Sequence, residues 1–431
     1  MNQVFRDAPA RWRQLPLKET VTACRNGTWG EEPHGSNSDI ICVRVADLDR
    51  RRARVLLDHA SLRLIPESFR RGRMLVRGDL LLEKSGGGDQ QPVGAVALYD
   101  HDAPAVCSNF MARMPVAPGF DPCYLCYLHA ALYTLGINRR SIHQTTGIQN
   151  LDSDQYLAEI VRIPGLEEQR RVARILDKKT KVIDELIDAK NRLIGCLQEK
   201  RRAIISQAVI EGLDRTAPRR PSGFPWLNDV PAHWRVTRLK FVRSGSLLYG
   251  ANQPASSADH NLPRYIRLTD FSGANALRDD TFQSLDESLA RPYLLEDGDI
   301  LLARSGATVG KALRYRASWG RACFASYLVR FRPDHRQILP DYFAWYTETH
   351  AFRQEVRLST VQATIANLSA ERYANFAIPL PPLGEQAAIV AFVNRRAHIL
   401  DSLISALEQQ IEKLCEYRSA LVVAMATRGG A

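Results

Sequence analysis

The chain has 431 residues, of which 45% are hydrophobic and 24% charged, and it carries a formal net charge of +11. This composition excludes a disordered or fibrous protein and allows two to four domains with cores of their own. No apolar run reaches the roughly 18 residues that span a bilayer, the first residues lack the apolar centre of a signal peptide, and eight cysteines are scattered, so we expect a cytoplasmic protein without membrane contact.

Residues 1–165 are predicted to form a mixed α/β domain. Short strands separated by Gly, Pro and Asp turns are expected over Ile40–Val45, Leu80–Leu82 and Val93–Leu98. The apolar run Cys123–Leu135 predicts a buried helix. A long helix is predicted over 166–212, where Gly212 is a natural stop, and a Pro-rich connector over 213–231.

The second half of the chain repeats the first. Residues 232–383 repeat the first domain, and residues 384–428 repeat the long helix at an offset of 217. The clearest matches pair Gly78–Gly86 with Gly298–Gly306 and Val161–Gln169 with Ile378–Gln386, whereas the loops between the anchors do not match. The predicted fold class is therefore α+β: two duplicated mixed α/β domains joined by two long antiparallel coiled-coil helices, with pseudo-two-fold symmetry.

Both long helices carry apolar residues at heptad spacing, which is typical of a coiled-coil seam. Because 217 is a multiple of seven, the two copies keep the same register. The residues that we expect to bind the partner helix and a partner protein are Leu176, Ile183, Ile187, Ile194, Leu197, Leu400, Ile404, Leu407, Ile411 and Leu414. Leu186, Leu193, Leu403 and Val422 flank this seam and widen it. The extra width predicts a face for another protein, although a simple intramolecular stem would also account for it.

The repeat also tests candidate chemical sites. The only CxxC, Cys123–Cys126, lacks a second ligand pair for zinc and is not repeated. Gly306–Lys311 resembles a phosphate loop but is one residue short, so a strand–turn–strand with a basic tip is expected. Asp79 and Asp299 are interpreted as turn residues before a buried strand, since the second copy lacks the further carboxylate that a metal nuclease needs. We expect no catalysis and no metal site in this chain.

Positive charge is shared between the halves. Residues 1–212 carry 31 Lys+Arg and 26 Asp+Glu (+5), and the remainder carries 27 and 21 (+6). Distributed basic charge favours a polyanion as partner.

The ordered motifs resemble the specificity (S) subunit of type I restriction–modification systems. The residues that carry the resemblance are NGTWGE at Asn26–Glu31, GDLLLEKSG at Gly78–Gly86, GDILLARSG at Gly298–Gly306, VRIPGLEEQ at Val161–Gln169, IPLPPLGEQ at Ile378–Gln386, and the helix after each copy. The resemblance covers essentially the whole chain. The first copy departs from the pattern where Gly165 and Glu167 stand in place of the second copy's Pro382 and Gly384.

The resemblance implies a DNA-binding subunit without activity of its own. Each α/β domain would read one half of a bipartite target in double-stranded DNA, and the helices would fix the gap between the half-sites. The partners implied are two methyltransferase (M) subunits, which bring S-adenosylmethionine, and two restriction (R) subunits, which use ATP and Mg. No cofactor is expected in this chain.

Residues expected to touch DNA lie at repeated polar tips and in unmatched loops. In the first domain they are Lys84, Ser85, Arg139, Arg140, Gln144, Thr145 and Thr146. In the second domain they are Arg304, Ser305, Lys311, Thr360, Gln362 and Thr364. The Thr-rich segments His143–Leu151 and Ser359–Leu368 are expected to precede helix starts, where hydroxyl groups suit phosphate contacts or ordinary helix capping. The arginine runs Arg50–Arg54 and Arg70–Arg73 would either follow a DNA backbone or form solvated faces.

Two other functions remain open at this stage. One is a non-catalytic scaffold or adaptor with non-specific DNA binding, which would explain the helices but not two divergent α/β domains. The other is a stand-alone methyltransferase or nuclease, which the missing motifs disfavour.

Overall fold

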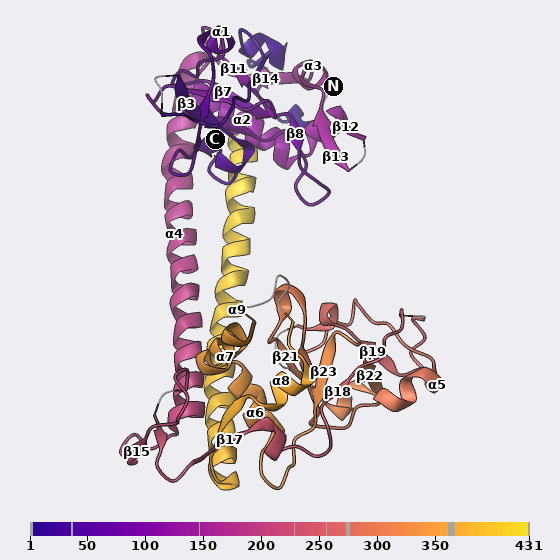
Figure 1. Cartoon of the computed structure of the whole chain (residues 1–431). Coiled ribbons are helices and arrows are strands. Elements are labelled where there is room, and N and C mark those ends of the chain that lie inside the picture. The colour runs from indigo at the N-terminus through magenta and orange to yellow at the C-terminus, as the bar shows by residue number, and fades with distance from the viewer. Residues whose placement is uncertain are drawn as a thin grey trace. The chain divides into compact units, whose positions relative to one another are not determined.

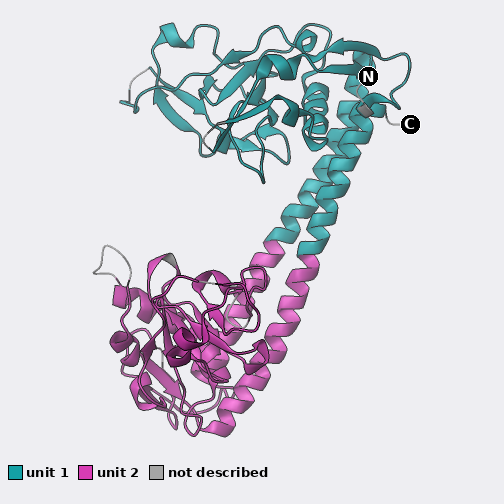
Figure 2. Cartoon of the chain, turned by 90° about the vertical axis from the view of Figure 1, so that its right-hand side faces the viewer, with its two compact units in different colours: residues 1–191, 408–431 teal, residues 192–407 magenta. Residues whose placement is uncertain are grey.

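The computed structural model describes residues 3–35, 38–145, 147–227, 229–255, 257–272, 276–360 and 367–429. The chain forms two compact units, shown in Figure 2. Unit 1 contains Met1–Asn191 and Glu408–Ala431, and unit 2 contains Arg192–Leu407. Each unit therefore holds one α/β domain, the beginning of the long helix that follows this domain, and the end of the other long helix. The division of the chain into successive segments stays a prediction.

Unit 1 combines short strands with few helices (Figure 1). Its strands are β1 (Arg13–Pro16), β2 (Arg25–Asn26), β3 (Asp39–Val43), β4 (Leu48–Asp49), β5 (Arg54–Val55), β6 (Ser61–Leu64), β7 (Leu80–Glu83), β8 (Ser85–Gly86), β9 (Val96–Leu98), β10 (Ala105–Cys107), β11 (Met111–Met114), β12 (Ile142–Thr145), β13 (Ile148–Leu151) and β14 (Ile160–Ile163). Its α-helices before the long one are α1 (Glu67–Arg70), α2 (Pro122–Thr134) and α3 (Ser153–Leu157). The largest sheet has the order β2-β11-β7-β9-β5-β4, and β12-β13-β8 form a separate sheet.

Unit 2 repeats the central part of this plan. Its strands are β15 (Arg219–Arg220), β16 (Val230–Pro231), β17 (Arg235–Arg238), β18 (Leu248–Tyr249), β19 (Arg264–Ile266), β20 (Ile300–Ala303), β21 (Ala312–Arg314), β22 (Ala322–Phe324), β23 (Leu328–Phe331) and β24 (Ala377–Leu380). Its helices are α5 (Glu287–Ala290), α6 (Pro340–Thr347), α7 (His350–Thr360) and α8 (Ala370–Ala374). The order β18-β23-β20-β21 matches β2-β11-β7-β9, and the parallel pair β19–β22 matches β3–β10. Helix α7 stands where unit 1 has the 3₁₀ turn Ile137–Ser141.

The two long helices pair antiparallel in both units. Helix α4 runs over Leu166–Ser206 and continues as one π-helical segment, Gln207–Glu211, while α9 runs over Leu383–Arg428. In unit 1, Arg418 Nε binds the buried Asp184 carboxylate at 3.0 Å; in unit 2, Arg201 Nε binds Asp401 at 2.8 Å. These ion pairs are related by the 217-residue offset. The predicted α+β class with two long helices is confirmed.

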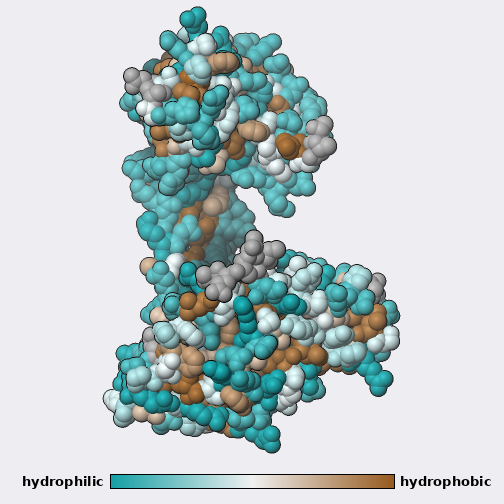
Figure 3. Space-filling view, in the orientation of Figure 1, coloured by the Kyte–Doolittle hydropathy of each residue, from teal (hydrophilic) through white to brown (hydrophobic). Residues whose placement is uncertain are grey.

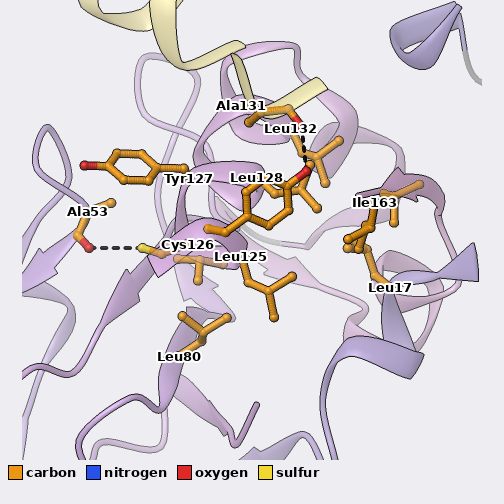
Figure 4. Packing of buried hydrophobic residues seen from close by; sticks show 14 of the residues in the cluster. Leu17, Ala53, Leu80, Leu125, Cys126, Tyr127, Leu128, Ala131, Leu132 and Ile163 are labelled. Carbon is orange, nitrogen blue, oxygen red and sulfur yellow. Dashed lines mark hydrogen bonds between the residues drawn. The ribbon is translucent and has the colours of Figure 1, made fainter. Parts of the chain in front are cut away.

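The end of each long helix packs into the α/β domain of the unit it enters. In unit 1 the Tyr124 hydroxyl donates to the carbonyl of Ala426 at 3.0 Å, and in unit 2 the Tyr342 hydroxyl donates to Val209 at 2.9 Å. Figure 4 shows the unit 1 core, in which Leu125 and Leu128 of α2 lie near Leu80 of β7. Each α/β core is thus completed by the end of the other copy's helix.

A buried glutamine fixes the start of each long helix. Gln169 accepts from the backbone N–H of Asp121 at 2.9 Å and donates to Pro164 at 2.9 Å. Gln386 likewise accepts from Leu339 at 2.8 Å and donates to Pro381 at 2.9 Å. Asp121 and Leu339 are the N-cap residues of α2 and α6, so this repeated side chain joins two helix starts.

Candidate nucleic-acid interface

In unit 1, the predicted residues Lys84 and Ser85 lie where β7 ends, at a polar tip. Lys84 Nζ donates to the side-chain oxygen of Asn26 at 2.8 Å. Ser85 Oγ donates to Asn150 Oδ1 at 2.6 Å, where β8 pairs with β13. The Lys84 carbonyl also accepts from the backbone N–H of Leu151 at 2.7 Å. The structure therefore brings one cation, a hydroxyl group and two amides together on a paired backbone.

The same backbone arrangement recurs in unit 2 with different side chains. The Arg304 carbonyl accepts from Leu368 N–H at 2.8 Å, and Ser305 pairs with Asn367 as Ser85 pairs with Asn150. The Arg304 guanidinium lies 4.5 Å from the centroid of the Tyr249 ring, and its Nε donates to Asn367 Oδ1 at 3.4 Å. A lysine–asparagine pair in one unit thus corresponds to an arginine–tyrosine pair in the other.

Each polar tip is held in position by a close contact between two backbone segments. A Cβ added to Gly27 would lie 2.0 Å from the Cys107 carbonyl oxygen, and one added to Gly250 would lie 2.2 Å from that of Phe324. Only glycine fits such contacts. Asn26 and Tyr249, the residues just before these glycines, are therefore held at matching positions of the two units.

Each Thr-rich segment precedes a helix start, as expected, but the residues that cap these helices lie just after the segments. In unit 1, Gln144 and Thr145 belong to β12, which forms a hairpin with β13. In unit 2, Thr360 ends α7, and its hydroxyl donates to the carbonyls of Val356 and Arg357. The caps of the short helices that follow are Asp152 and Ser369, whose side chains accept backbone N–H groups of α3 and α8. These backbone bonds lower the pKa of Asp152, with the bond from Gln155 contributing most.

The other predicted DNA contacts are dispersed. Arg139 and Arg140 are exposed on the 3₁₀ turn Ile137–Ser141, and Arg140 also lies 3.6 Å from Glu159. Lys311 is exposed after the 3₁₀ turn Gly306–Thr308, which gives the predicted strand–turn–strand with a basic tip. Thr146, Gln362 and Thr364 lie outside the described residues.

Helix α7 supplies two cations that the sequence analysis missed. Arg353 and Arg357 stand one turn apart on its exposed side, while Phe352 and Val356 are buried beneath them. They border a hollow of about 550 Å³ that Lys311 also lines. Neither arginine forms a side-chain ion pair within the described part of the chain. The i, i+4 spacing of these two arginines, which places them on one face of a helix, is the sequence signal that could have identified them.

A second basic hollow adjoins the tip of unit 1. It has a volume of about 500 Å³, and Arg25, Arg71 and Lys84 line it, with Asp154 as the acidic member. Arg73 also lines this hollow and donates to the carbonyl of Asn26 at 3.2 Å, whereas Arg70 donates to the carbonyl of Ile65 at 2.7 Å. The run therefore contains loop-fixing residues as well as surface charge.

The first arginine run holds the α/β domain onto α4, which neither interpretation of the sequence foresaw. Its members form ion pairs with acidic residues of this helix: Arg51 with Asp184 and Asp188, Arg52 with Asp188, and Arg54 with Asp177. Arg50 instead binds the buried Glu83. These side chains are largely occupied within unit 1 and are not a free surface for DNA.

The heptad residues divide by burial. Leu176, Ile183, Ile187 and Leu400 are buried, and Ile194, Leu197, Ile404, Leu407, Ile411 and Leu414 are half-buried. Most of the seam is therefore used within the chain. Val182, Leu186, Leu193, Ile399 and Leu403 are instead 45–61% exposed. Figure 3 shows hydrophobic surface along the long helices. Val422, which we had grouped with the extra face, is buried.

Two buried titratable groups have strongly shifted pKa values. Burial lowers the pKa of His129 to about 4, and its Nδ1 lies 2.7 Å from the Tyr156 hydroxyl. Burial raises the pKa of Glu355 on α7 to about 7, although its Oε1 accepts from Ala377 N–H at 3.0 Å. Both side chains are almost fully buried, so their shifted pKa values bear on stability, although Glu355 also borders a hollow of about 540 Å³.

Within the described residues, no group of three or more His, Cys, Asp or Glu side chains is arranged to hold a metal ion. None of the helices in these same residues has an apolar stretch suited to crossing a lipid bilayer.

Comparison with known proteins agrees with this arrangement. Residues 276–414 match the type I restriction modification DNA specificity domain. The StySPI specificity subunit of a type I restriction enzyme from Salmonella potsdam is 22% identical over 98% of this chain and 89% of its own length. A protein of Methanocaldococcus jannaschii, provisionally named the MjaX specificity subunit of a type I restriction enzyme, is 20% identical over 95% of this chain and 91% of its own.

A solved structure shares the fold along the whole chain. It belongs to a study of complex assembly and conformational transition in a type I restriction–modification system, and it aligns with a TM-score of 0.68 at 19% identity. The alignment covers 98% of this chain and 99% of the other. By its matched domain and these two relatives, the chain is similar to the specificity subunits of type I restriction enzymes, and the solved structure shares its fold.

Proposed function

We propose that the two units read the two halves of a bipartite sequence in double-stranded DNA. The observation that carries this proposal is the paired tips: one backbone frame presents Lys84 with Asn26 in unit 1 and Arg304 with Tyr249 in unit 2. Amide, hydroxyl and guanidinium groups read base edges and bind phosphates. A copied frame with different side chains suits two unlike half-sites, as identical dimers suit palindromes.

A second difference between the units supports the same function. Unit 2 has helix α7, with Arg353 and Arg357 on its exposed side, in the stretch where unit 1 has the 3₁₀ turn Ile137–Ser141. Cations on an exposed helix face suit the phosphate backbone beside a groove. Helix α7 shares a hollow with Lys311, which follows the tip residues Arg304 and Ser305 in the chain, so this difference lies near the tip of unit 2, where DNA would be met.

The long helices would fix the gap between half-sites and bind methyltransferase (M) subunits. Both run without a break from one unit into the other, and the 46 residues of α9 correspond to about 70 Å of helix. Val182 and Leu186 on α4 and Ile399 and Leu403 on α9 are exposed at i, i+4 spacing, at positions related by the 217-residue offset. Two equivalent apolar patches suit two copies of one partner. S-adenosylmethionine would be bound by these M subunits, ATP and Mg by restriction (R) subunits, and no cofactor by this chain.

A domain exchange tests the proposal. The full chain would be co-expressed with its partner methyltransferase, and N6-methyladenine would be mapped. A split motif with a constant gap is expected. Exchanging residues 232–383 for the matching domain of another specificity subunit should change one half of the motif and leave the other half and the gap unchanged. Two unchanged halves would contradict the modular reading.

A scaffold that binds DNA non-specifically is the alternative function. It would give binding with a steep salt dependence and no preferred sequence. Competition between the mapped motif and scrambled duplexes at several salt concentrations separates the two, because specific binding is typically at least 1,000-fold tighter than non-specific binding.

A further inference from the structure

Unit 1 contains a hollow of about 390 Å³ beside its polar tip, with walls that are mostly apolar. The lining residues used below are Trp29, Val45, Ala46, Ser108, Asn109 and Phe110. Its volume falls in the range of small-molecule sites, roughly 300–1,000 Å³. Ser85 and Gly86 of β8 also border it, so the hollow adjoins the residues proposed to meet DNA.

Two aromatic rings at this hollow are exposed to solvent. Trp29 is 44% exposed and Phe110 is 48% exposed. The Arg63 guanidinium lies 4.3 Å from the Trp29 ring centroid, and Arg63 is itself ion-paired with Glu32. The indole is therefore held from one side by a stacked cation rather than hanging loosely in water. A ring held in this way is prepared to stack on a flat ligand.

The hollow also offers one unsatisfied polar group. Ser108 is 1% exposed, and its hydroxyl has no hydrogen-bond partner among the residues that the structure describes. Most buried hydroxyl groups in proteins are hydrogen-bonded, since burying one without a partner is unfavourable. Rotation of the Ser108 side chain toward the hollow would let the polar edge of a ligand supply the missing partner, and the Asn109 amide lies in the same lining.

The charged residues around the hollow limit further the class of ligand that it could bind. No carboxylate lines the hollow, and the nearby Arg44 is already bound to Asp47 at 2.9 Å and to the His59 carbonyl at 3.0 Å. Lys84 precedes Ser85 in the chain. The immediate surroundings are thus close to neutral, since Arg44 is paired with Asp47 and Arg63 with Glu32. Such surroundings suit a neutral, flat group with a polar edge that is attached to an anionic backbone. A nucleobase of DNA has these properties.

Unit 2 does not repeat this chemistry. At the positions that correspond to Trp29, Ser108 and Phe110, it has Asn252, Ala325 and Tyr327. The indole and the hydroxyl are both absent there, although the backbone contacts of Gly27 and Gly250 are the same. The indole and the serine hydroxyl at this hollow are therefore particular to unit 1 and not part of the shared scaffold.

We propose that the Trp29–Phe110 hollow takes one unstacked nucleobase of the half-site read by unit 1. The base would stack on the aromatic rings and hydrogen-bond to Ser108. This inference rests on the proposed DNA-reading function and adds to it a base-binding subsite outside the methyltransferase. An unstacked base is available in such a complex, because methylation of an adenine in duplex DNA requires that base to leave the stack and leaves its partner unpaired.

The test places 2-aminopurine, a base whose fluorescence rises on unstacking and is quenched by stacking on indole, at each position of the mapped motif in turn. The full chain with its partner methyltransferase is then titrated onto each duplex. A response that differs between wild type and Trp29→Leu at one position of the first half-site is expected. Affinity for the motif should fall about 5- to 100-fold in Trp29→Leu and in Phe110→Leu, as for loss of base–aromatic stacking. Phe69→Leu, which changes another exposed aromatic of unit 1, should bind as wild type.

The outcomes separate this inference from the proposed function. If Trp29→Leu and Ser108→Ala bind and methylate the motif as wild type does, the hollow is not a base subsite, while DNA reading by the unit stands. If Trp29→Leu weakens binding of the methyltransferase in the absence of DNA, the hollow holds a protein side chain and the inference is wrong. If the wild-type complex prefers no sequence at all, the proposed function fails first.

Discussion

At the scale of single residues, the two copies keep the residues that hold the backbone in its turns, whereas the side chains at the polar tips differ. Asp79 and Asp299 both accept a backbone N–H three residues earlier, at 2.7 and 2.8 Å, and bind Arg113 and Arg332. This turn role could be predicted from the sequence, because an aspartate before a buried strand can bond to the backbone of its own turn. The partners of Lys84 and Arg304 could not be predicted, since Asn26 and Tyr249 approach them only through the tertiary fold.

Replacement of Gly27 or Gly250 by alanine should destabilise the unit that contains it. The added methyl group would meet a carbonyl oxygen at 2.0 Å or 2.2 Å, and backbone on both sides cannot move away cheaply. We expect each change to lower the free energy of unfolding by about 3 kcal/mol, as for a severe overpacking change. Chemical denaturation measures this loss. Gly88→Ala, at a glycine with open space around it, should change stability by less than about 1 kcal/mol.

Glu355 should make unit 2 less stable as the pH rises. Burial raises its pKa from 4.5 to about 7, so the folded state keeps a proton that the unfolded state has lost. Stability from this group is therefore lost between about pH 4.5 and 7, by an amount on the order of 3 kcal/mol. Glu355→Gln should remove this dependence and be the more stable protein at pH 8, with no gain at pH 4.5.

The measurement is chemical denaturation at these two pH values. Glu371→Gln, on an exposed side chain of α8, is the matched control and should behave as wild type. An equal effect of Glu355→Gln at both pH values would show that the carboxyl stays ionised in the folded state.

At the scale of elements, strands and helices with a strong local pattern were predictable and the recognition elements were not. Cys123–Leu135 was expected as a buried helix, and α2 covers Pro122–Thr134. The segment His143–Leu151 has polar residues that suit a turn or a cap, yet it forms the β12–β13 hairpin because Asn150 pairs with Ser85 of a distant strand. Long-range pairing of this kind leaves no periodic signal in a nine-residue segment.

Helix α7 should contribute phosphate contacts to the half-site of unit 2. Arg353 and Arg357 are exposed one turn apart and have no side-chain carboxylate partner in the described residues. The double variant Arg353→Gln/Arg357→Gln should lower the slope of log affinity against log salt by about two, while the mapped sequence stays the same. Titration of the motif at four or more salt concentrations gives this slope.

The matched control removes the same charge elsewhere. Arg395 and Arg396 are adjacent exposed arginines on α9, and Arg395→Gln/Arg396→Gln should leave the slope unchanged. A relaxed sequence preference in the α7 variant, with an unchanged slope, would instead assign these arginines to base edges.

At the scale of the whole molecule, the heptad register predicted that the helices pair, but not which domain receives each helix end. A shared register says only that the seams are compatible. The antiparallel pairing carries the end of α9 to unit 1 and the end of α4 to unit 2, where Ala426 and Val209 accept from Tyr124 and Tyr342. This exchange depends on side chains separated by 302 and 133 residues, which no local pattern encodes.

The exposed apolar patches on the two long helices allow the number of bound methyltransferase subunits to be tested. The patch Val182–Leu186 belongs to unit 1 and the patch Ile399–Leu403 to unit 2, and each presents exposed apolar side chains one helical turn apart. If each patch binds one methyltransferase subunit, Val182→Ser/Leu186→Ser should give a complex with one such subunit, Ile399→Ser/Leu403→Ser should do the same, and the combined variant should bind none. Mass photometry of the co-expressed proteins counts the subunits directly.

The control for this experiment lies on the same helices. Lys181→Ser and His398→Ser change exposed residues next to the patches, at positions again related by the 217-residue offset, and should leave two subunits bound. Because the four patch residues are exposed, thermal unfolding of the isolated variants should match wild type, which separates lost docking from lost folding. Loss of both subunits after changing one patch alone would mean that the two partners bind cooperatively through each other, and the independence of the two patches would then be wrong.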